Sequence, residues 1–266
     1  MSLPWGWIVS AAVYGAAVGA LLPRAVYRLA VEPEQPWRTA CPAGHPLGSG
    51  VRGLLGAARC PRCATTGRTG PDDVHEGAPA TGPQGAYGSG RVVPVVVGAL
   101  VCAGLTAAVG TRPELVVWLL ATPVALLLTE VDRRVQRLPD LLTLPLAAGV
   151  VLLLGPAALL PGAAGSWPRA LLGGLVLAGA FFVLFLISPR GMGFGDVKLA
   201  LTLGVVLGWY GWGVLFAGAF LGFLSGSLYG VALMATRRAG RGTAMAFGPF
   251  MVLGALGGVL VAAPAA

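Results

Sequence analysis

Charged residues are scarce in this chain of 266 residues, where they make up 11% of the sequence. Soluble domains carry about 25% charged residues, so the scarcity excludes an ordinary water-soluble domain. Lysine occurs once, as Lys198, and the other 17 cations are arginines. The first 22 residues are apolar and contain no basic residue. Because a secretory signal begins with a basic stretch, we expect no cleavable signal peptide.

Apolar residues are abundant instead: they form 56% of the chain, and the mean hydropathy is +0.80. Several runs reach about 18 apolar residues, the length of a membrane-spanning helix. We therefore predict an all-α, polytopic membrane protein with about eight transmembrane helices. The predicted spans are 5–22, 92–110, 114–128, 141–160, 171–187, 197–207, 213–235 and 245–261.

The cations lie almost entirely in alternate connecting segments. Of the 18, 16 fall in segments 23–91, 129–140, 188–198 and 236–244, whereas the other connections hold only Arg112 and Arg169. The positive-inside rule places the four basic segments in the cytoplasm and both termini outside. Membrane topology thus accounts for the net charge of +8, and we expect no nucleic-acid partner.

The same pattern divides the chain into three parts. Residues 1–22 form the first transmembrane helix, 23–91 a polar cytoplasmic loop, and 92–266 a transmembrane core. The arginines of the loops are expected to set this topology and to meet lipid headgroups of the bilayer.

Acidic residues are rare in the core, and four of them share the cytoplasmic side. They are Glu130, Asp132, Asp140 and Asp196, since the topology places Glu114 on the opposite side. Two carboxyl groups that share one proton have split pKa values, so one can take a proton from water while the other polarises a carbonyl. Such a pair suits peptide hydrolysis. Asp140, directly before an apolar run, also fits a helix N-cap.

Asp196 lies in an unusual setting, between two apolar runs in the stretch Arg190-Gly191-Met192-Gly193-Phe194-Gly195-Asp196-Val197-Lys198. A charge at membrane depth costs several kcal/mol, so this carboxylate should lie at an interface or line a wet cavity. Gly193 and Gly195 carry no side chain, which lets backbone or substrate approach the carboxylate closely.

Two motifs here resemble those of a known family. Gly193-Phe194-Gly195-Asp196 resembles the G-x-G-D motif of intramembrane aspartyl proteases, and its surroundings resemble the type IV prepilin peptidase family. In that family an Asp precedes a Pro-Asp pair by seven residues, as Asp132 precedes Pro139-Asp140 here. Phe247-Gly248-Pro249-Phe250 is similar to the family's Pro-Phe-Gly-Pro element. Arg134 departs from the pattern, because many members carry an acidic residue there.

The resemblance implies that Asp132 and Asp196 are the catalytic pair, framed by Gly193, Gly195 and Lys198. It implies cleavage of a short basic leader from prepilins or pseudopilins, after a glycine, at the cytoplasmic face of the cell membrane. Lys198 could also tune Asp196 or contact lipid. The particular pilin, the protonated member of the pair and the oligomeric state stay open.

The family also implies a possible second activity, N-methylation of the new pilin N-terminus with S-adenosylmethionine. Two other functions compete with the peptidase. A transporter would use Asp132 and Asp196 as an ion site, and a scaffold of a pilus or secretion machine would carry a degenerate site.

The loop 23–91 contains a candidate metal site. Cys41 and His45 are separated by three residues, fourteen more follow, and then come Cys60 and Cys63 with two between them. Two close pairs of thiol and imidazole ligands predict a structural zinc knuckle. Many relatives carry two C-x2-C pairs in this loop, so His45 substitutes for a cysteine and His75 is the competing ligand. Free thiols or a Cys60–Cys63 redox pair are the alternatives.

Overall fold

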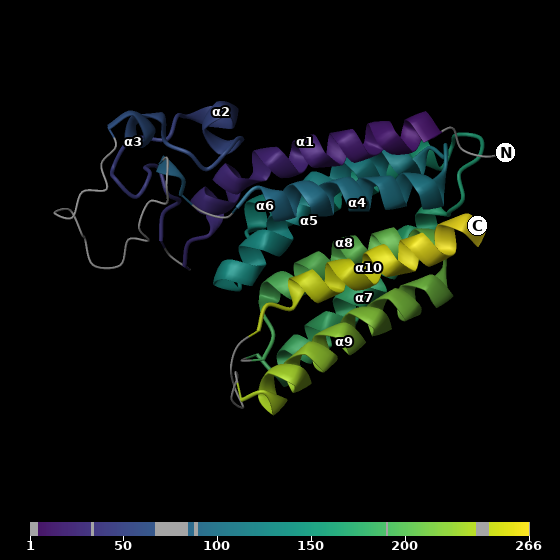
Figure 1. The fold of residues 1–266 in the computed structure, drawn as a ribbon. Coiled ribbons are helices and arrows are strands. Elements are labelled where there is room, and N and C mark those ends of the chain that lie inside the picture. Colours follow the sequence, from purple (N-terminus) through teal and green to yellow (C-terminus); the bar gives the residue numbers. More distant parts are fainter. Residues whose placement is uncertain are drawn as a thin grey trace.

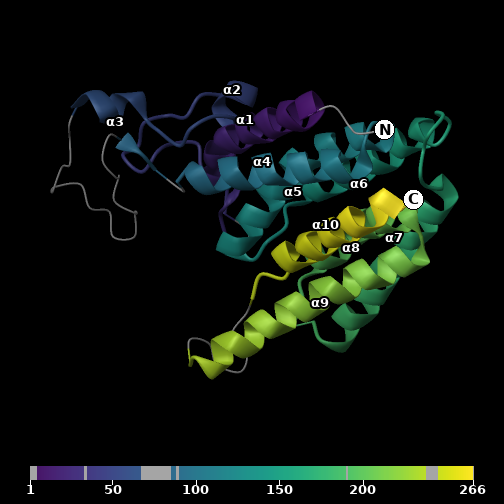
Figure 2. The same ribbon diagram turned by 45° about the vertical axis from the view of Figure 1, so that its right-hand side comes forward.

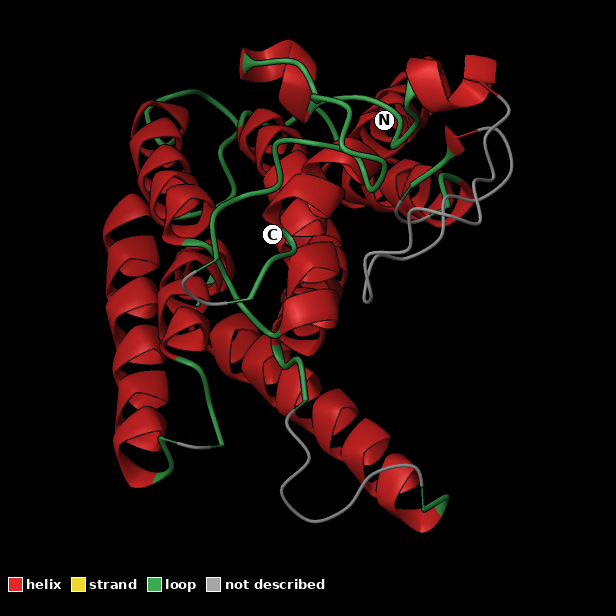
Figure 3. Cartoon of the chain, turned by 90° about the vertical axis from the view of Figure 1, so that its left-hand side faces the viewer, coloured by secondary structure: helices red, strands yellow, loops and turns green. Residues whose placement is uncertain are grey.

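The computed structural model describes residues 5–32, 35–66, 85–87, 90–189, 191–237 and 245–265. Within these ranges the chain forms helices and loops (Figure 3), with extended pairing limited to two isolated bridges in the loop after the first helix. The long helices are α1 Trp5–Leu29, α4 Val92–Val109, α5 Glu114–Val135, α6 Asp140–Ala157, α7 Trp167–Ile187, α8 Phe194–Tyr210, α9 Trp212–Ala235 and α10 Gly248–Ala262. Two short helices, α2 Gly50–Leu54 and α3 Pro61–Thr66, lie between α1 and α4, and a 3-10 turn, Ala263–Ala265, follows α10. The predicted all-α class is confirmed.

The eight long helices correspond one by one to the eight predicted spans. Six of them, α1, α4, α5, α6, α7 and α9, are long and apolar enough to cross a membrane. The other two are shorter, with 17 residues in α8 and 15 in α10. The described chain is therefore a multi-pass membrane protein. The two shorter helices, α8 and α10, each pack against several neighbouring helices.

Helix α8 is the central helix of the bundle. It packs against α6, α7, α9 and α10, and eleven of its seventeen residues are buried. The contact with α7 is so close that a Cβ on Gly204 would lie 2.5 Å from the carbonyl oxygen of Gly173. Small residues allow such backbone contact between helices in a membrane. Neighbouring helices thus cover most of the surface of α8. Because little of it faces lipid, α8 can be shorter than a lipid-facing span.

The bundle has two distinct ends. Figure 1 shows both chain termini at one end and the short helices α2 and α3 at the other. Helix α10 lies between α9, at the edge of the bundle, and the group formed by α4 and α5 (Figure 2). The C-terminal ends of α5, α7 and α9, after which three of the predicted basic segments begin or continue, lie at the same end of the bundle as α2 and α3 (Figure 1).

Two helices extend beyond their predicted spans. Helix α1 was expected to end at residue 22 but continues to Leu29, because its last two turns pack on Leu127 and Val131 of α5. The loop docks there as well, since the Arg24 backbone N–H donates to Gly56 and the Gly56 N–H donates to Leu21. Helix α5 was expected to end at residue 128 and continues to Val135. Asp132 therefore lies in the last turn of a helix.

Candidate active site and metal centre

Asp132 is held at the end of α5 with its carboxylate buried. The helix ends at Gln136, which adopts the left-handed conformation with φ 49° and donates its N–H to the Asp132 carbonyl at 2.8 Å. The Asp132 side chain is only 4% exposed. Its Oδ2 accepts a hydrogen bond of 3.0 Å from the backbone N–H of Gly248, at the start of α10.

Asp196 lies in the first turn of α8. Gly193 is the N-cap residue, and its backbone N–H donates to Oδ2 of Asp196 at 3.1 Å. The Asp196 N–H donates in turn to the Gly193 carbonyl at 3.0 Å. The Asp196 residue is 7% exposed. Each of the two aspartates therefore accepts one backbone hydrogen bond and is largely withdrawn from solvent.

The start of α10 lies between the helices that carry the two aspartates. A Cβ on Gly248 would be 2.8 Å from Oδ2 of Asp132 and 3.5 Å from Cδ2 of Leu199, on α8. The Asp132 and Asp196 carboxylates lie within range of each other's charge. The start of α10 therefore lies beside Asp132 and against the helix that carries Asp196.

The glycines of the G-x-G-D stretch have separate roles in the structure. Gly193 caps α8 and supplies the N–H to Asp196, as described above. At Gly195 the connection between α5 and α6 comes very close, because a Cβ there would lie 2.8 Å from Cβ of Leu138. Leu138 is itself 7% exposed. Gly195 thus lets this connection seat on the first turn of α8.

The remaining acidic candidates carry cationic partners. Glu130 pairs with Arg134 at 3.1 Å and with Arg133 at 3.5 Å. Asp140 pairs with Lys198, whose Nζ lies 2.6 Å from Oδ1. The predicted N-cap role of Asp140 is wrong: extended Pro139 occupies the cap position, and the Asp140 side chain turns to Lys198.

Lys198 is the site residue whose contacts differ most from expectation. Its ammonium group pairs with Asp140 and lies 5.0 Å from the centre of the Phe194 ring. The pair joins the start of α6 to the start of α8, beside the contact of Leu138 with Gly195. The described contacts of Lys198 are thus with Asp140 and Phe194.

Glu114 lies apart from these residues, at the opposite end of α5 from Asp132. Its side chain is fully buried, and Oε1 accepts the Ala164 N–H at 3.3 Å. The topological argument that removed Glu114 from the catalytic candidates agrees with this position.

Three arginines of the segment 23–91, two of which lie in the extended end of α1, make specific protein contacts. Arg24 donates to the carbonyl of Ala57, Arg28 to that of Gly48, and Arg38 to that of Tyr27. Arg137, in the α5–α6 connection, donates to the Glu32 carbonyl. These contacts are additional to the predicted roles of the cations in membrane topology and at lipid headgroups. They also fasten the loop to the extended end of α1.

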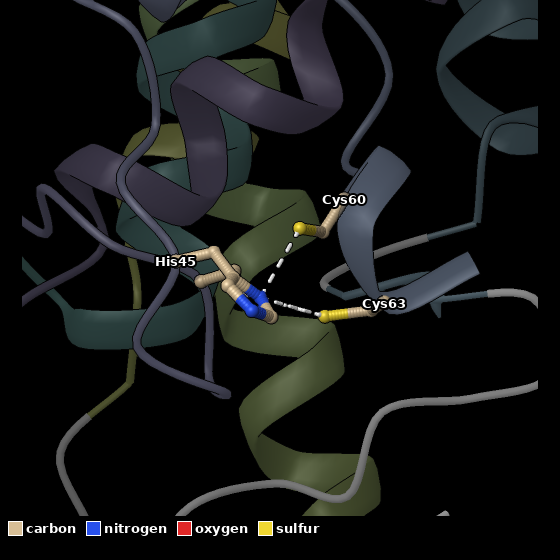
Figure 4. A group of neighbouring side chains, drawn as sticks. His45, Cys60 and Cys63 are labelled. Atoms are coloured by element: carbon tan, nitrogen blue, oxygen red, sulfur yellow. Dashed lines mark hydrogen bonds between the residues drawn. The ribbon is translucent and has the colours of Figure 1, made fainter. Parts of the chain in front are cut away.

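Three thiols and one imidazole converge in this loop. Figure 4 shows the side chains of His45, Cys60 and Cys63 pointing toward one another. Nδ1 of His45 lies 3.3 Å from Sγ of Cys63 and 3.6 Å from both Cys41 and Cys60. The Cys41 and Cys63 sulfurs are 3.8 Å apart. Cys41 and His45 are joined by a turn in which Gly44 has φ +78°. The four predicted ligands thus lie in one cluster.

The cluster has the dimensions of a tetrahedral metal site. Zinc lies about 2.3 Å from sulfur and about 2.0–2.1 Å from nitrogen, which gives ligand separations of about 3.8 Å between sulfurs and about 3.5 Å between sulfur and nitrogen. The Cys41–Cys63 distance of 3.8 Å and the distances of 3.3–3.6 Å from His45 to the sulfurs are close to these values. Burial, with hydrogen bonds to Cys60 and Cys41, raises the pKa of Cys63 to about 12. A bound cation would supply the charge needed to keep this thiol ionised.

Two predicted cysteine and histidine assignments have different outcomes. Cys102, expected to be a core residue of its span, is fully buried in α4. His75, the competing metal ligand, lies outside the described residues. The described geometry supports His45 as the fourth member of a group that could hold a metal ion.

One residue that touches the site was not assigned a role from the sequence. Gly248 was noted only as part of the Phe247–Phe250 resemblance, yet its N–H contacts Asp132. The signal was a glycine between Phe247 and Pro249, near the start of the predicted span 245–261. That signal indicates a close approach at the start of a helix but does not reveal the partner.

Comparison with known proteins places the chain among leader peptidases. Residues 118–235 match the type IV leader peptidase family. A prepilin leader peptidase/N-methyltransferase of Pseudomonas putida is 32% identical over 270 residues, covering 94% of this chain and 89% of the relative. A protein with the same name from Stutzerimonas stutzeri is 27% identical over 95% of this chain and 90% of the relative. Another, from Pseudomonas aeruginosa, is 36% identical over 51% of this chain and 46% of the relative. No solved structure gives a significant match. The full-length similarity and the matched peptidase segment show that this chain belongs to the type IV leader peptidase family.

Proposed function

We propose that this protein is a membrane aspartyl endopeptidase that removes the basic leader from type IV prepilins or pseudopilins, after a glycine. The observation that carries the proposal is the pair of buried carboxylates, Asp132 and Asp196, at one end of a membrane helix bundle. The names of the relatives supply the substrate class.

The pair has the chemistry that hydrolysis of a peptide bond requires. The ionised carboxylate takes a proton from a water molecule, whose oxygen attacks the scissile carbonyl carbon. The protonated carboxyl group donates to the carbonyl oxygen as the tetrahedral intermediate forms. A proton then passes to the leaving nitrogen, and the C–N bond breaks. Asp132 and Asp196 act as one titrating unit, so the proton belongs to the pair.

The proposed orientation places the pair at the cytoplasmic face of the inner membrane, with both termini outside. Support comes from the 16 cations that the sequence places in segments 23–91, 129–140, 188–198 and 236–244. The ends of α5, α7 and α9 from which three of these segments continue lie opposite the end that holds both termini (Figure 1). The apolar helix of the substrate would remain in the bilayer while its leader reached the pair from the cytoplasm.

We further propose that Cys41, His45, Cys60 and Cys63 hold a structural zinc ion. The four ligand atoms lie within 4.8 Å of one another, and the site is closed because every tetrahedral position has a protein ligand. Zinc in such a site supplies folding stability.

N-methylation is a second candidate activity. The relatives' names pair peptidase with N-methyltransferase, and the methyl donor would be S-adenosylmethionine. Incubation of the cleaved pilin with this protein and the donor should replace one hydrogen of the new N-terminal amine by a methyl group, which adds the mass of CH2. An unchanged mass after complete cleavage would restrict this chain to peptidase activity.

The peptidase is tested with purified protein in detergent and a prepilin that carries a basic leader and a Gly–apolar junction. We expect the parent to cleave after the glycine and Asp132→Asn or Asp196→Asn to lose at least about a hundredfold in rate. Glu130→Gln is the matched control, because this carboxylate is ion-paired outside the dyad. Full activity of either Asn variant would refute the dyad. Ion flux in proteoliposomes without prepilin cleavage would favour a transporter. A protein that shows neither cleavage nor ion flux would favour a scaffold.

A further inference from the structure

The start of α10 has one backbone donor aimed at Asp132. The N–H groups in the first turn of a helix have no partner within the helix. Here Phe250 and Met251 direct theirs to the Phe247 carbonyl at 3.1 and 3.2 Å, and Pro249 has none. Gly248 is left with a free N–H, and it donates to Oδ2 of Asp132 at 3.0 Å.

Glycine is the residue that this approach allows. A Cβ on residue 248 would lie 2.8 Å from Oδ2 of Asp132 and 3.3 Å from its Cγ. Both separations are shorter than ordinary van der Waals contact, and the carboxylate is buried. Any side chain at residue 248 would therefore displace either the carboxylate or the start of α10.

The position of Gly248 is set by its neighbour Phe247. The Phe247 ring lies 5.1 Å from that of Phe223, on α9, and 6.2 Å from that of Phe181, on α7. Phe181 and Phe223 are 5.2 Å apart, so the three rings form one cluster. Gly226 makes room for it, because a Cβ there would lie 2.9 Å from Cε2 of Phe247.

We propose that the Phe247-Gly248 turn is a positioning element for Asp132, in which helices α7 and α9 hold the Phe247 ring and the Gly248 N–H fixes the Asp132 carboxylate. Gly248 touches Asp132 directly, and Phe247, Phe181, Phe223 and Gly226 act through it. The inference rests on the proposed peptidase function and adds positioning residues to it. The physical reason is that a dyad works only while its two carboxyl groups keep their mutual geometry, and a displacement of about 1 Å can cost a hundredfold in rate.

The test uses two glycine substitutions in the full-length protein and the prepilin cleavage assay. Gly248→Ala should lower kcat about a hundredfold and leave KM within about twofold, because the substrate still binds while the dyad is displaced. Gly226→Ala, which touches neither aspartate, should lower kcat in the same way through the Phe247 ring. Adding Phe247→Leu to Gly226→Ala should restore part of the lost kcat, since a smaller side chain leaves room for the new methyl group.

Gly179→Ala on α7 is the matched control, since a Cβ there has nothing within 4 Å, and it should retain parental kcat and KM. Melting temperature and elution volume report folding for every variant, and Gly226→Ala carries the test if Gly248→Ala does not fold. A folded Gly248→Ala with parental kcat overturns the inference while the peptidase stands. The inference is also overturned if the glycine variants lose kcat only together with a lowered melting temperature and Phe247→Leu does not restore kcat, because this result indicates a structural role only. A parent protein that cleaves no prepilin removes the proposed function and this inference together.

Discussion

The metal cluster gives a prediction about the stability of the long loop. Replacing Cys63 by Ser, or removing the metal with a strong chelator, should unfold the loop around residues 39–63 and leave the helix bundle intact. The reason is that this segment has few apolar side chains of its own. Besides the cysteines, its buried cluster contains Tyr27, Ala58 and Tyr87.

The expected size of the effect follows from these contacts. At roughly 2 kcal/mol for each large apolar side chain, the two tyrosines and the alanine contribute about 5 kcal/mol. A four-ligand structural zinc contributes about 10–16 kcal/mol in small zinc-dependent peptides. The metal should therefore provide the larger part of the loop's stability, and its removal should be felt throughout the cluster.

Hydrogen exchange measured by mass spectrometry, together with metal analysis, is the appropriate assay. The parent should contain one metal ion per chain and protect the amides of residues 41, 44 and 60, which donate to backbone carbonyls. Cys63→Ser should lose the metal and this protection, while α4 to α10 keep theirs. Cys102→Ala, at a cysteine buried in α4, is the control and should keep one metal. Loop protection that persists in a chain shown to be free of metal would refute the reasoning.

Further predictions concern the frame of the dyad. Asp140→Asn should lower the cleavage rate less than about fivefold, because an exposed ion pair contributes about 1 kcal/mol or less; a hundredfold loss would make Asp140 part of the chemistry. Gly195→Ala should lower both the cleavage rate and the melting temperature, because its Cβ would lie 2.8 Å from that of Leu138. Gly149→Ala, with nothing within 4 Å, should match the parent in both measurements, and a parental Gly195→Ala would contradict the close approach.

The predicted C-terminal ends of α1 and α5 differ most from the structure. Apolar runs located every long helix, but the ends of α1 and α5 depend on contacts that a run does not reveal. Leu22 and Leu29 of α1 pack on Leu127 and Val131 of α5, and this contact carries both helices beyond their apolar runs. The same physical cause places Asp132 inside a helix instead of in a connecting segment.

The sequence by itself predicted the membrane class, the eight long helices of the described ranges, and the four cysteine and histidine residues that could hold a metal ion. It also singled out two aspartates through their resemblance to family motifs. These features lie in local stretches of sequence: apolar runs, the motifs around Asp132 and Asp196 that resemble those of the family, and the spacing of cysteines and a histidine. The aspartates were then placed at the same end of the bundle by counting spans and cations, which requires no knowledge of side-chain packing.

Only the tertiary structure decided what surrounds the two aspartates. The hydrogen bond from Gly248 to Asp132 joins residues 116 apart in the chain, and the Lys198–Asp140 pair joins residues 58 apart. No local pattern specifies such partners, because they depend on how α10 and α8 pack against their neighbours. The central burial of α8 has the same origin: its sequence predicts a short span, and the helices around it make that length sufficient.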